Sequence, residues 1–388
     1  MSCLDVSSLT HDIRYTTYDI RHTFMRIINR YLLKELGGPF VASLFVSTFI
    51  LAAGNIAQTM DMVVNKGVEF DQVIKLFLYF LPYVLIFTIP ISVLSAVLLG
   101  FGRLSGDNEI TALRTTGISL YHMILPLILC GVMISLVNVP LNDKVFPESE
   151  YAARKLAKKI GVRHPAALLE PGVFIKGFKD YVVFIHSIKG NDLRDIRIYQ
   201  PQKDGLTRTI VAKRGEIVSG ENEDNIKLRL EDGTADEIVP NKPDEFLKLS
   251  FQEYHMTLDV DGAMKDESIG KKTREKSIKE LLGDIKALGS SKSASVPFRI
   301  EIHKKIALAF SNLAFVLIGI PLAITTHRRE KFVGFGLAMG LFLMYWGIML
   351  AGIAFALRSV IPPWVGVWSA NIMLVSLASV LIYRMTVR

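Results

Sequence analysis

The sequence predicts an α-helical membrane protein with six transmembrane helices and an all-β domain inserted between the third and the fourth. Of the 388 residues 50% are hydrophobic, the mean hydropathy is +0.35, and the apolar residues are concentrated towards the two ends of the chain. Between those ends, from about residue 172, apolar residues alternate with a period of two, which is typical of strands. We therefore expect a polytopic membrane protein with a soluble middle part.

Six segments are long and apolar enough to cross about 30 Å of hydrocarbon as helices. They cover residues 36–60, 73–101, 120–139, 306–325, 332–357 and 363–383. The prolines inside these segments are tolerable, because neighbouring helices can satisfy the carbonyls that a proline frees. The first three spans form a region over 25–139, and the last three form a region over 298–388. Residues 1–24 are polar, lack the apolar core of a secretory signal, and are expected to be a poorly ordered extension.

Lysine and arginine in the short loops predict the orientation. They precede the first span, lie between spans two and three and between spans four and five, and follow the last span. These positions all fall on one side of the membrane if the spans alternate, whereas the opposite loop, 61–72, is net acidic. Both termini are therefore expected in the cytoplasm, and the insert over 140–297 outside it.

The insert begins with a helical pattern over 142–160 and then changes to a strand pattern. Six alternating runs follow without an intervening helix, and turn signals such as 189–192, 203–205 and 231–233 bound them. This pattern predicts an all-β sandwich or a partly open barrel. An amphipathic helix over 277–288 and a Ser-rich linker over 289–295 then return the chain to the membrane.

One polar interval, residues 102–122, separates the second and third spans and is too long for a simple turn. Its apolar positions Ile110, Leu113 and Ile118 recur at roughly helical spacing, and Gly117 indicates where a helix stops. We interpret the interval as a short helix over about 103–117 that lies at the membrane face and is presented to a partner.

Four charged residues of this interval are candidates for that contact: Arg103, Asp107, Glu109 and Arg114. Glu109 is the strongest candidate, because an acidic side chain on a projecting cytoplasmic helix can bind a basic pocket on a soluble motor protein. The alternative is a solvated carboxylate that the positive N-terminal end of the helix favours. The residues by themselves leave both readings open.

Polar residues within or beside the spans are the other candidates, since burial in lipid is costly unless they face protein or a cavity. Asn55 and Gln58 of the first span could contact a substrate or form hydrogen bonds between helices, as could Asn138, Asn312 and Asn371. Arg299, Lys304 and Lys305 gather at the outer end of span four, against the positive-inside bias. They either extend to lipid headgroups or line a cavity for a phosphorylated lipid.

Catalytic and cofactor motifs are weak throughout. Residues 270–273 superficially resemble a phosphate loop, but Lys265 stands where that loop needs glycine. The histidines are scattered without ligand spacing, so a metal site is not expected. The net charge of +8 fits cytoplasmic loops and anionic lipid better than nucleic acid, for which no motif is present. Cys3 lies in the polar N-terminal segment and Cys130 in an apolar segment, so the two are not expected to form a disulfide.

Three passages carry a family resemblance: RIINRYLLKEL, LPYVLIFTIPISVLSAVLLGFGRLSGDNEITALRTTGIS and RIEIHKKIALAFSNLAFVLIGIPLAI. The chain resembles the LptF/LptG (YjgP/YjgQ) permeases of the lipopolysaccharide exporter from residue 25 to its end. Within that family, RLSGDNEITALRTTGIS and the strand pair VVFIHSIKGNDLRDIRIYQ favour the LptF branch over LptG.

The resemblance implies a heterodimer of two six-helix permeases, here with LptG as the paralogue, in the inner membrane of a Gram-negative bacterium. It implies a separate LptB ATPase dimer that uses ATP, so that this chain needs no cofactor and has no catalytic site. It also implies extraction of lipopolysaccharide and its delivery, through a jelly-roll domain, to a periplasmic bridge of LptC and LptA. Glu109 matches the acid of the family's coupling helix by motif position. A competing hypothesis is a membrane-anchored scaffold or receptor whose β-domain binds a partner.

Overall fold

A computed structural model describes residues 6–64, 68–163, 171–178, 181–189, 192–201, 207–219, 225–238, 246–259, 270–289, 292–326 and 331–387. The chain divides into two compact units. The first, called the membrane unit, comprises Met1–Ala52, Pro82–Glu148 and Thr273–Arg388. The second, called the sheet unit, comprises Ala53–Leu81 and Ser149–Lys272.

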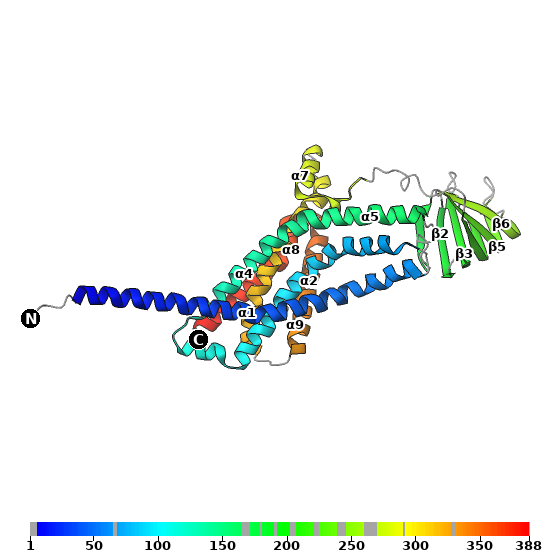
Figure 1. Cartoon of the computed structure of the whole chain (residues 1–388). Coiled ribbons are helices and arrows are strands. Elements are labelled where there is room, and N and C mark those ends of the chain that lie inside the picture. Colours follow the sequence, from blue (N-terminus) through cyan, green and yellow to red (C-terminus); the bar gives the residue numbers. More distant parts are fainter. Residues whose placement is uncertain are drawn as a thin grey trace, which may run out of the picture. The chain divides into compact units, whose positions relative to one another are not determined.

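Long helices account for most of the membrane unit (Figure 1). The helices of the chain are α1 (Val6–Val64), α2 (Phe70–Gly106), α3 (Glu109–Thr115), α4 (Leu120–Pro140), the π-helix η1 (Leu141–Val145), α5 (Phe146–Arg163), the 3₁₀ turn η3 (Thr273–Glu275), α7 (Ile278–Ala287), α8 (Lys292–Thr326), α9 (Lys331–Leu357) and α10 (Pro363–Val387). Six of them, α1, α2, α4 with its continuation, α8, α9 and α10, are long and apolar enough to cross a membrane. The predicted set of six spans is confirmed.

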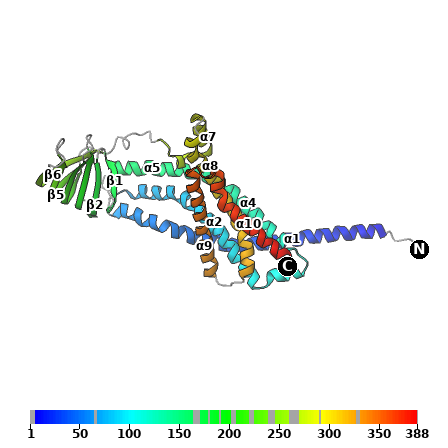
Figure 2. The same cartoon turned by 180° about the vertical axis from the view of Figure 1, so that it is seen from behind.

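Helices α2 and α8 are the central ones, because most of their apolar length is buried whereas the other four spans are largely exposed. Helix α8 packs against α4 and against α10, which in turn packs against α9 (Figure 2). The approach of α9 and α10 is very close: a Cβ on Gly352 would lie 2.0 Å from the carbonyl oxygen of Gly366. Glycine is required at this crossing because the two backbones touch.

Six antiparallel strands form one sheet in the sheet unit. They are β1 (Phe174–Phe178), β2 (Tyr181–Lys189), β3 (Asp192–Pro201), β4 (Thr207–Ser219), β5 (Asn225–Ile238) and β6 (Phe246–Asp259). Each strand pairs with the next along the chain, so the sheet is a meander. The six predicted runs all became strands, and the inserted all-β domain is confirmed.

The buried side chains of the sheet alternate along each strand, but the alternation slips by one residue midway. In β3 it passes from Leu193 to Ile196, and in β5 from Leu230 to Gly233. The pairing register is constant from β2 to β6, so no extra residue is inserted and the slip is not a β-bulge. Asp195 of β3 lies at the slip with a φ of 51°. The strands carry the slip at the same level, so the face that each strand buries changes along one line across the sheet.

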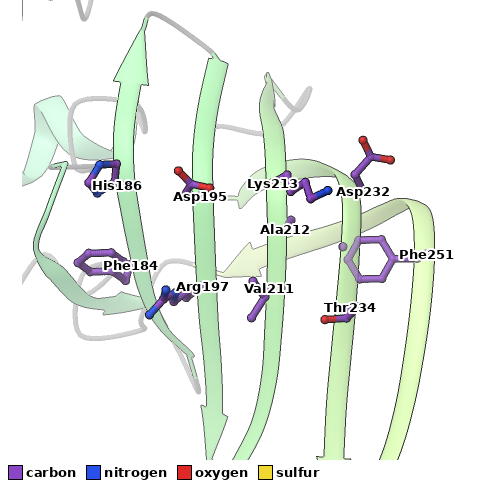
Figure 3. Close-up of a pocket in the computed structure, with 11 residues that line it drawn as sticks. Phe184, His186, Asp195, Arg197, Val211, Ala212, Lys213, Asp232, Thr234 and Phe251 are labelled. Atoms are coloured by element: carbon purple, nitrogen blue, oxygen red, sulfur yellow. The ribbon is translucent and has the colours of Figure 1, made fainter.

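This line also corrects one prediction. Residues 231–233 were expected to form a turn that bounds a strand, yet they lie inside β5, where Asp232 has a φ of 52°. Aspartate tolerates the left-handed conformation, so the Asp-Gly pair can lie within a strand as well as in a turn. Asp195, Lys213 and Asp232 form a polar row across three strands and line a cavity of about 630 Å³ (Figure 3).

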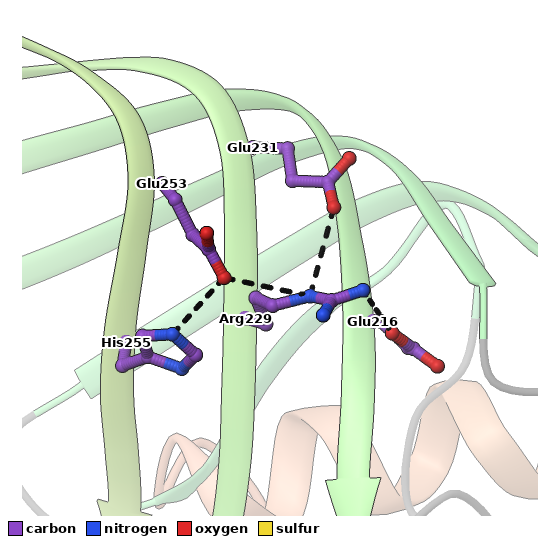
Figure 4. Close-up of polar contacts among 5 residues, drawn as sticks. All are labelled: Glu216, Arg229, Glu231, Glu253 and His255. Atoms are coloured by element: carbon purple, nitrogen blue, oxygen red, sulfur yellow. Dashed lines mark hydrogen bonds and ion pairs between the residues drawn. The ribbon is translucent and has the colours of Figure 1, made fainter.

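A second group of charges crosses β4, β5 and β6 around Arg229 (Figure 4). The Arg229 guanidinium donates to Glu216 over 2.6 Å, and its Nε lies 3.6 Å from Glu231 and 3.8 Å from Glu253. His255 Nε2 lies 3.1 Å from the same Glu253 oxygen. These side chains are all partly exposed, so the group holds neighbouring strands in register by modest cross-strand contacts.

The return to the membrane differs partly from expectation. Helix α7 begins as predicted, with Ser277 and Glu280 forming a reciprocal capping box. The Ser-rich stretch over 289–295 was expected to be a linker, but α8 already begins at Lys292. Ser295 is buried and Val296 packs against a small apolar cluster, so tertiary packing overrides the low helix propensity of serine.

Candidate functional site

The interval between α2 and α4 lies in the membrane unit and is divided by a sharp turn. Helix α2 ends at Gly106 with Arg103 in its last turn, where a cation complements the negative end of the helix. Asp107 and Asn108 turn the chain, and Asn108 has a φ of 59°. Helix α3 begins at Glu109. The predicted helix over 103–117 is therefore two helices joined by a left-handed residue, with Arg103 and Glu109 on opposite sides of the turn.

Apolar side chains fix α3 to the membrane unit. Ile110 is 4% exposed and belongs to the main core, and Leu113 and Ile118 pack against that core. These are the three positions whose spacing predicted the helix, so the prediction of one apolar face is confirmed. A helix of seven residues is too short to be stable alone, and this docking supplies the stability.

The end of α3 is equally well defined. Gly117 has a φ of 86°, its N–H donates to the Arg114 carbonyl, and the Ile118 N–H donates to the Leu113 carbonyl. These two bonds make a Schellman motif, in which glycine is favoured because its left-handed conformation carries no Cβ penalty. The prediction that Gly117 ends the helix is confirmed.

Two polar contacts tie this interval to α1 near the start of its membrane-spanning part. The Tyr31 hydroxyl donates to Glu109 Oε2 over 2.7 Å. Arg103 forms an ion pair with Glu35 and lies 3.7 Å from Asp107. Tyr31 and Glu35 are four residues apart, so they project from one face of α1. One face of α1 therefore holds the last turn of α2 and the first turn of α3.

The remaining surface of α3 is polar and accessible. Arg114 is exposed, as are Asp107 and Arg103 beside it, whereas Glu109 is half-buried against Tyr31. A rigid helix with charges of both signs on its exposed side can form a protein contact with little ordering cost. Arg103, Asp107, Glu109 and Arg114 are thus brought together, and their contact with a partner stays a prediction.

The predicted lipid-binding residues are distributed over both units. Asn55 and Gln58 belong to the sheet unit, where Asn55 is half-buried and Gln58 exposed. Arg299, Lys304 and Lys305 belong to the membrane unit, and Arg299 is exposed. The contact of any of these five with lipid stays a prediction.

Lys305 and Lys304 have partners within the protein. Lys305 is 3% exposed, and its Nζ donates to the Asn142 carbonyl of η1 over 3.1 Å. Lys304 pairs with the buried Glu301 over 2.6 Å. The ends of η1 and α7 are joined nearby, because Asp143 Oδ1 accepts from the Ile278 N–H over 2.6 Å. A π-helix widens the turn, and here it directs the Asn142 carbonyl to Lys305.

Sequence reasoning missed the partners in both places. Tyr31 and Glu35 meet their partners through packing of distinct helices, whereas Glu301 and Lys304 are three residues apart on α8. A usable signal existed in both places, because Tyr31 and Glu35 are spaced i, i+4 immediately before the first span and Glu301 and Lys304 are spaced i, i+3. The i, i+4 spacing indicates a shared face but does not indicate what the face contacts.

Comparison with known proteins identifies the architecture. The family model described as "Lipopolysaccharide export system permease LptF/LptG" matches residues 30–384. The chain belongs to the LptF/LptG family. The lipopolysaccharide export system permease protein LptF of Escherichia coli (strain K12) is 22% identical over 363 residues, which cover 92% of this chain and 94% of that relative. LptF of Shigella flexneri and of Escherichia coli O157:H7 match equally.

Membership in the LptF/LptG family confirms the predicted resemblance over almost the whole chain. It makes this chain a multi-pass permease of a lipopolysaccharide transport system, with six apolar helices and an inserted sheet. The α3 interval and the charged groups near η1 both lie inside the matched residues.

Proposed function

We propose that this chain is the LptF-type permease subunit of an ABC transporter in the inner membrane of a Gram-negative bacterium. It extracts lipopolysaccharide from the outer leaflet and passes it to a periplasmic bridge of LptC- and LptA-type β-domains. A paralogous permease of the LptG type completes the membrane part. Both termini are cytoplasmic, and the inserted β-domain is periplasmic.

A separate LptB-type ATPase dimer supplies the energy, and ATP is bound by that partner. The observation that carries this proposal is the docked α3 helix. Its apolar face packs against the core through Ile110 and Leu113, and the charged residues on its other side are accessible to a partner protein. In this role Glu109 contacts the ATPase, while Asp107, Arg103 and Arg114 complete the contact surface.

The test is the substitution Glu109→Arg in the full chain expressed with its transporter partners. We expect co-purification of the ATPase to fall and lipopolysaccharide to accumulate in the inner membrane, because the charge at the contact is reversed. Lys279→Glu, a charge reversal at an exposed position of α7, serves as the control and should leave both readouts unchanged. Unchanged ATPase binding with Glu109→Arg would contradict the coupling role.

A membrane-anchored scaffold or receptor is the competing function. Depletion of the chain separates the two, because a permease subunit is required for lipopolysaccharide to leave the inner membrane. If lipopolysaccharide still reaches the cell surface while a partner of the sheet unit loses its membrane anchor, the scaffold function is correct. The docking of α3 favours the permease, since an anchor needs no rigid cytoplasmic helix.

A further inference from the structure

A groove on the membrane unit is not explained by lipopolysaccharide export or by the ATPase contact. It has a volume of about 270 Å³ and is lined by α1, α2, α4 and α8. Its walls are almost entirely apolar, and include Leu33, Gly37 and Phe40 of α1 and Cys130 and Gly131 of α4. We call it the α1–α4 groove.

Two glycines shape the groove in different ways. A Cβ on Gly37 would meet no atom within 4 Å, so its missing side chain leaves real space. On α4, a Cβ on Gly131 would lie 3.0 Å from Val316 of α8, so the helices approach closely at the floor. The groove is therefore a built recess between packed helices, and its exposed side faces the surface where Cys130 is accessible.

A basic stripe leads to the groove along α1. Arg26, Arg30 and Lys34 recur every four residues and are exposed. Arg30, Leu33 and Gly37 share one helix face at i, i+3 and i+7. Arg30 lies about 5 Å along the axis before Leu33 and about 15 Å before Phe40. That span equals one leaflet, which is roughly half of the 30 Å hydrocarbon core.

The other walls of the groove lie at a matching depth. The Ser105 hydroxyl near the end of α2 donates to the Ile324 carbonyl near the end of α8, and Arg103 of α2 pairs with Glu35, so these two helices end near the level of Glu35 in α1. Val97 of α2 and Val316 of α8 line the groove about eight residues, or about 12 Å, from those ends. The groove thus extends inward from the headgroup level where Arg30 lies.

Volume and charge together indicate the occupant of the groove. The volume of about 270 Å³ and the nearly all-apolar walls accommodate a segment of a single acyl chain, and cations beside the groove distinguish a lipid from an apolar helix. An apolar recess in a membrane with cations at the headgroup level fits an acyl chain that ends in an anionic phosphate.

We propose that the α1–α4 groove binds one acyl chain of an acidic glycerophospholipid in the leaflet where the membrane-spanning part of α1 begins, with the phosphate held by Arg30 and its basic neighbours. This site is distinct from the export path. The bound lipid packs between α1 and α4. It thereby stabilises the position of α1, which contacts the α3 interval through Tyr31 and Glu35.

Protection of Cys130 tests the site in the full-length chain in nanodiscs. With Cys3→Ser in the background, Cys130 is the one thiol, and its alkylation by a membrane-permeant maleimide reports occupancy. Phosphatidylglycerol should slow alkylation at least fivefold relative to phosphatidylcholine. Arg30→Gln should weaken the phosphatidylglycerol effect about fivefold, because one cation near the surface contributes about that much. Arg384→Gln, an exposed cation in the last turn of α10, should not change it.

A substitution that fills the groove provides a second, independent test of the site. Gly37→Leu should itself slow alkylation of Cys130 and abolish the added effect of phosphatidylglycerol. Gly38→Leu is the matched control, since its Cβ also meets nothing within 4 Å but the residue does not line the groove. Equal protection by phosphatidylcholine and no effect of Arg30→Gln would show unselective boundary lipid and overturn the proposal. Protection by lipopolysaccharide or by a co-purified subunit, without protection by phosphatidylglycerol, would overturn it as well.

Discussion

The membrane unit has a charged group at each end, and the two groups differ in what their charges contact. At the α3 end, the side chains of Arg103 and Asp107 are 60% and 44% exposed. At the α7 end, which comprises η1, α7 and the start of α8, Lys304 and Glu301 are 19% and 8% exposed. Charges at the α3 end remain accessible to a partner, whereas those at the α7 end mostly hold the chain together.

The comparison shows why a cluster of charges in a sequence does not define a binding site by itself. Both groups were predicted as sites because their residue types suit a charged partner. Burial distinguishes them, since an exposed ion pair contributes little and can exchange partners, but a buried charge is destabilising unless its hydrogen bonds are kept.

The largest effect is expected at the α7 end. Lys305→Ala leaves the Asn142 carbonyl unsatisfied and removes buried packing, so we expect the free energy of unfolding to fall by about 2–4 kcal/mol. Thermal unfolding of the purified chain measures this loss. Arg299→Ala, at an exposed position of the same helix, should stay within about 0.5 kcal/mol. Equal losses for the two variants would mean that the α7 end is no more structural than the surface.

The next effect concerns the docking of α3. Ile110→Ala removes a buried side chain from the main core and should cost about 2 kcal/mol, less than in a rigid core because a short helix can shift. Hydrogen exchange of the α3 amides should become faster. Thr111→Ala, on the exposed side of α3, provides the matched comparison and should leave exchange nearly unchanged. Unaltered protection in Ile110→Ala would argue that the tethers to α1 alone hold α3.

The same substitution should have opposite signs at the two ends. Gly117→Ala forces a left-handed alanine and is expected to destabilise by about 1 kcal/mol. Gly283→Ala lies within α7 with open space at its Cβ and should stabilise by up to about 1 kcal/mol through helix propensity. Chemical denaturation of both variants provides the measurement, and a shared sign would refute the assignment of the Schellman motif.

The smallest effect is expected from the tether between α1 and α3. Tyr31→Phe removes one partly exposed hydrogen bond to Glu109 and should cost about 0.5 kcal/mol. A double-mutant cycle with Glu109→Gln isolates the coupling between the two side chains. A coupling energy indistinguishable from zero would leave α3 held by its apolar face alone.

Much of the architecture follows from patterns that are local in the sequence. The six apolar segments, the six alternating runs and the C-terminal end of α3 each depend on residues within a few positions of one another. Capping by Ser277 and termination at Gly117 were predictable for the same reason, because hydrogen bonds at helix ends are satisfied locally. The Asp232-Gly233 pair was misread because an Asp-Gly pair, which is typical of turns, can also lie within a strand.

Tertiary structure alone decided which charges meet. Tyr31 and Glu109 are 78 residues apart, and Lys305 and Asn142 are 163 apart, so no local pattern links them. The length and apolar composition of a segment determine that α1, α4 and α8 can cross a membrane, and the spacing of its residues determines which of them share a face. The neighbours of that face depend on how all the helices pack at once. That packing buries Lys305, leaves Arg103 exposed, and opens a groove at Gly37 that no periodicity in the sequence could indicate.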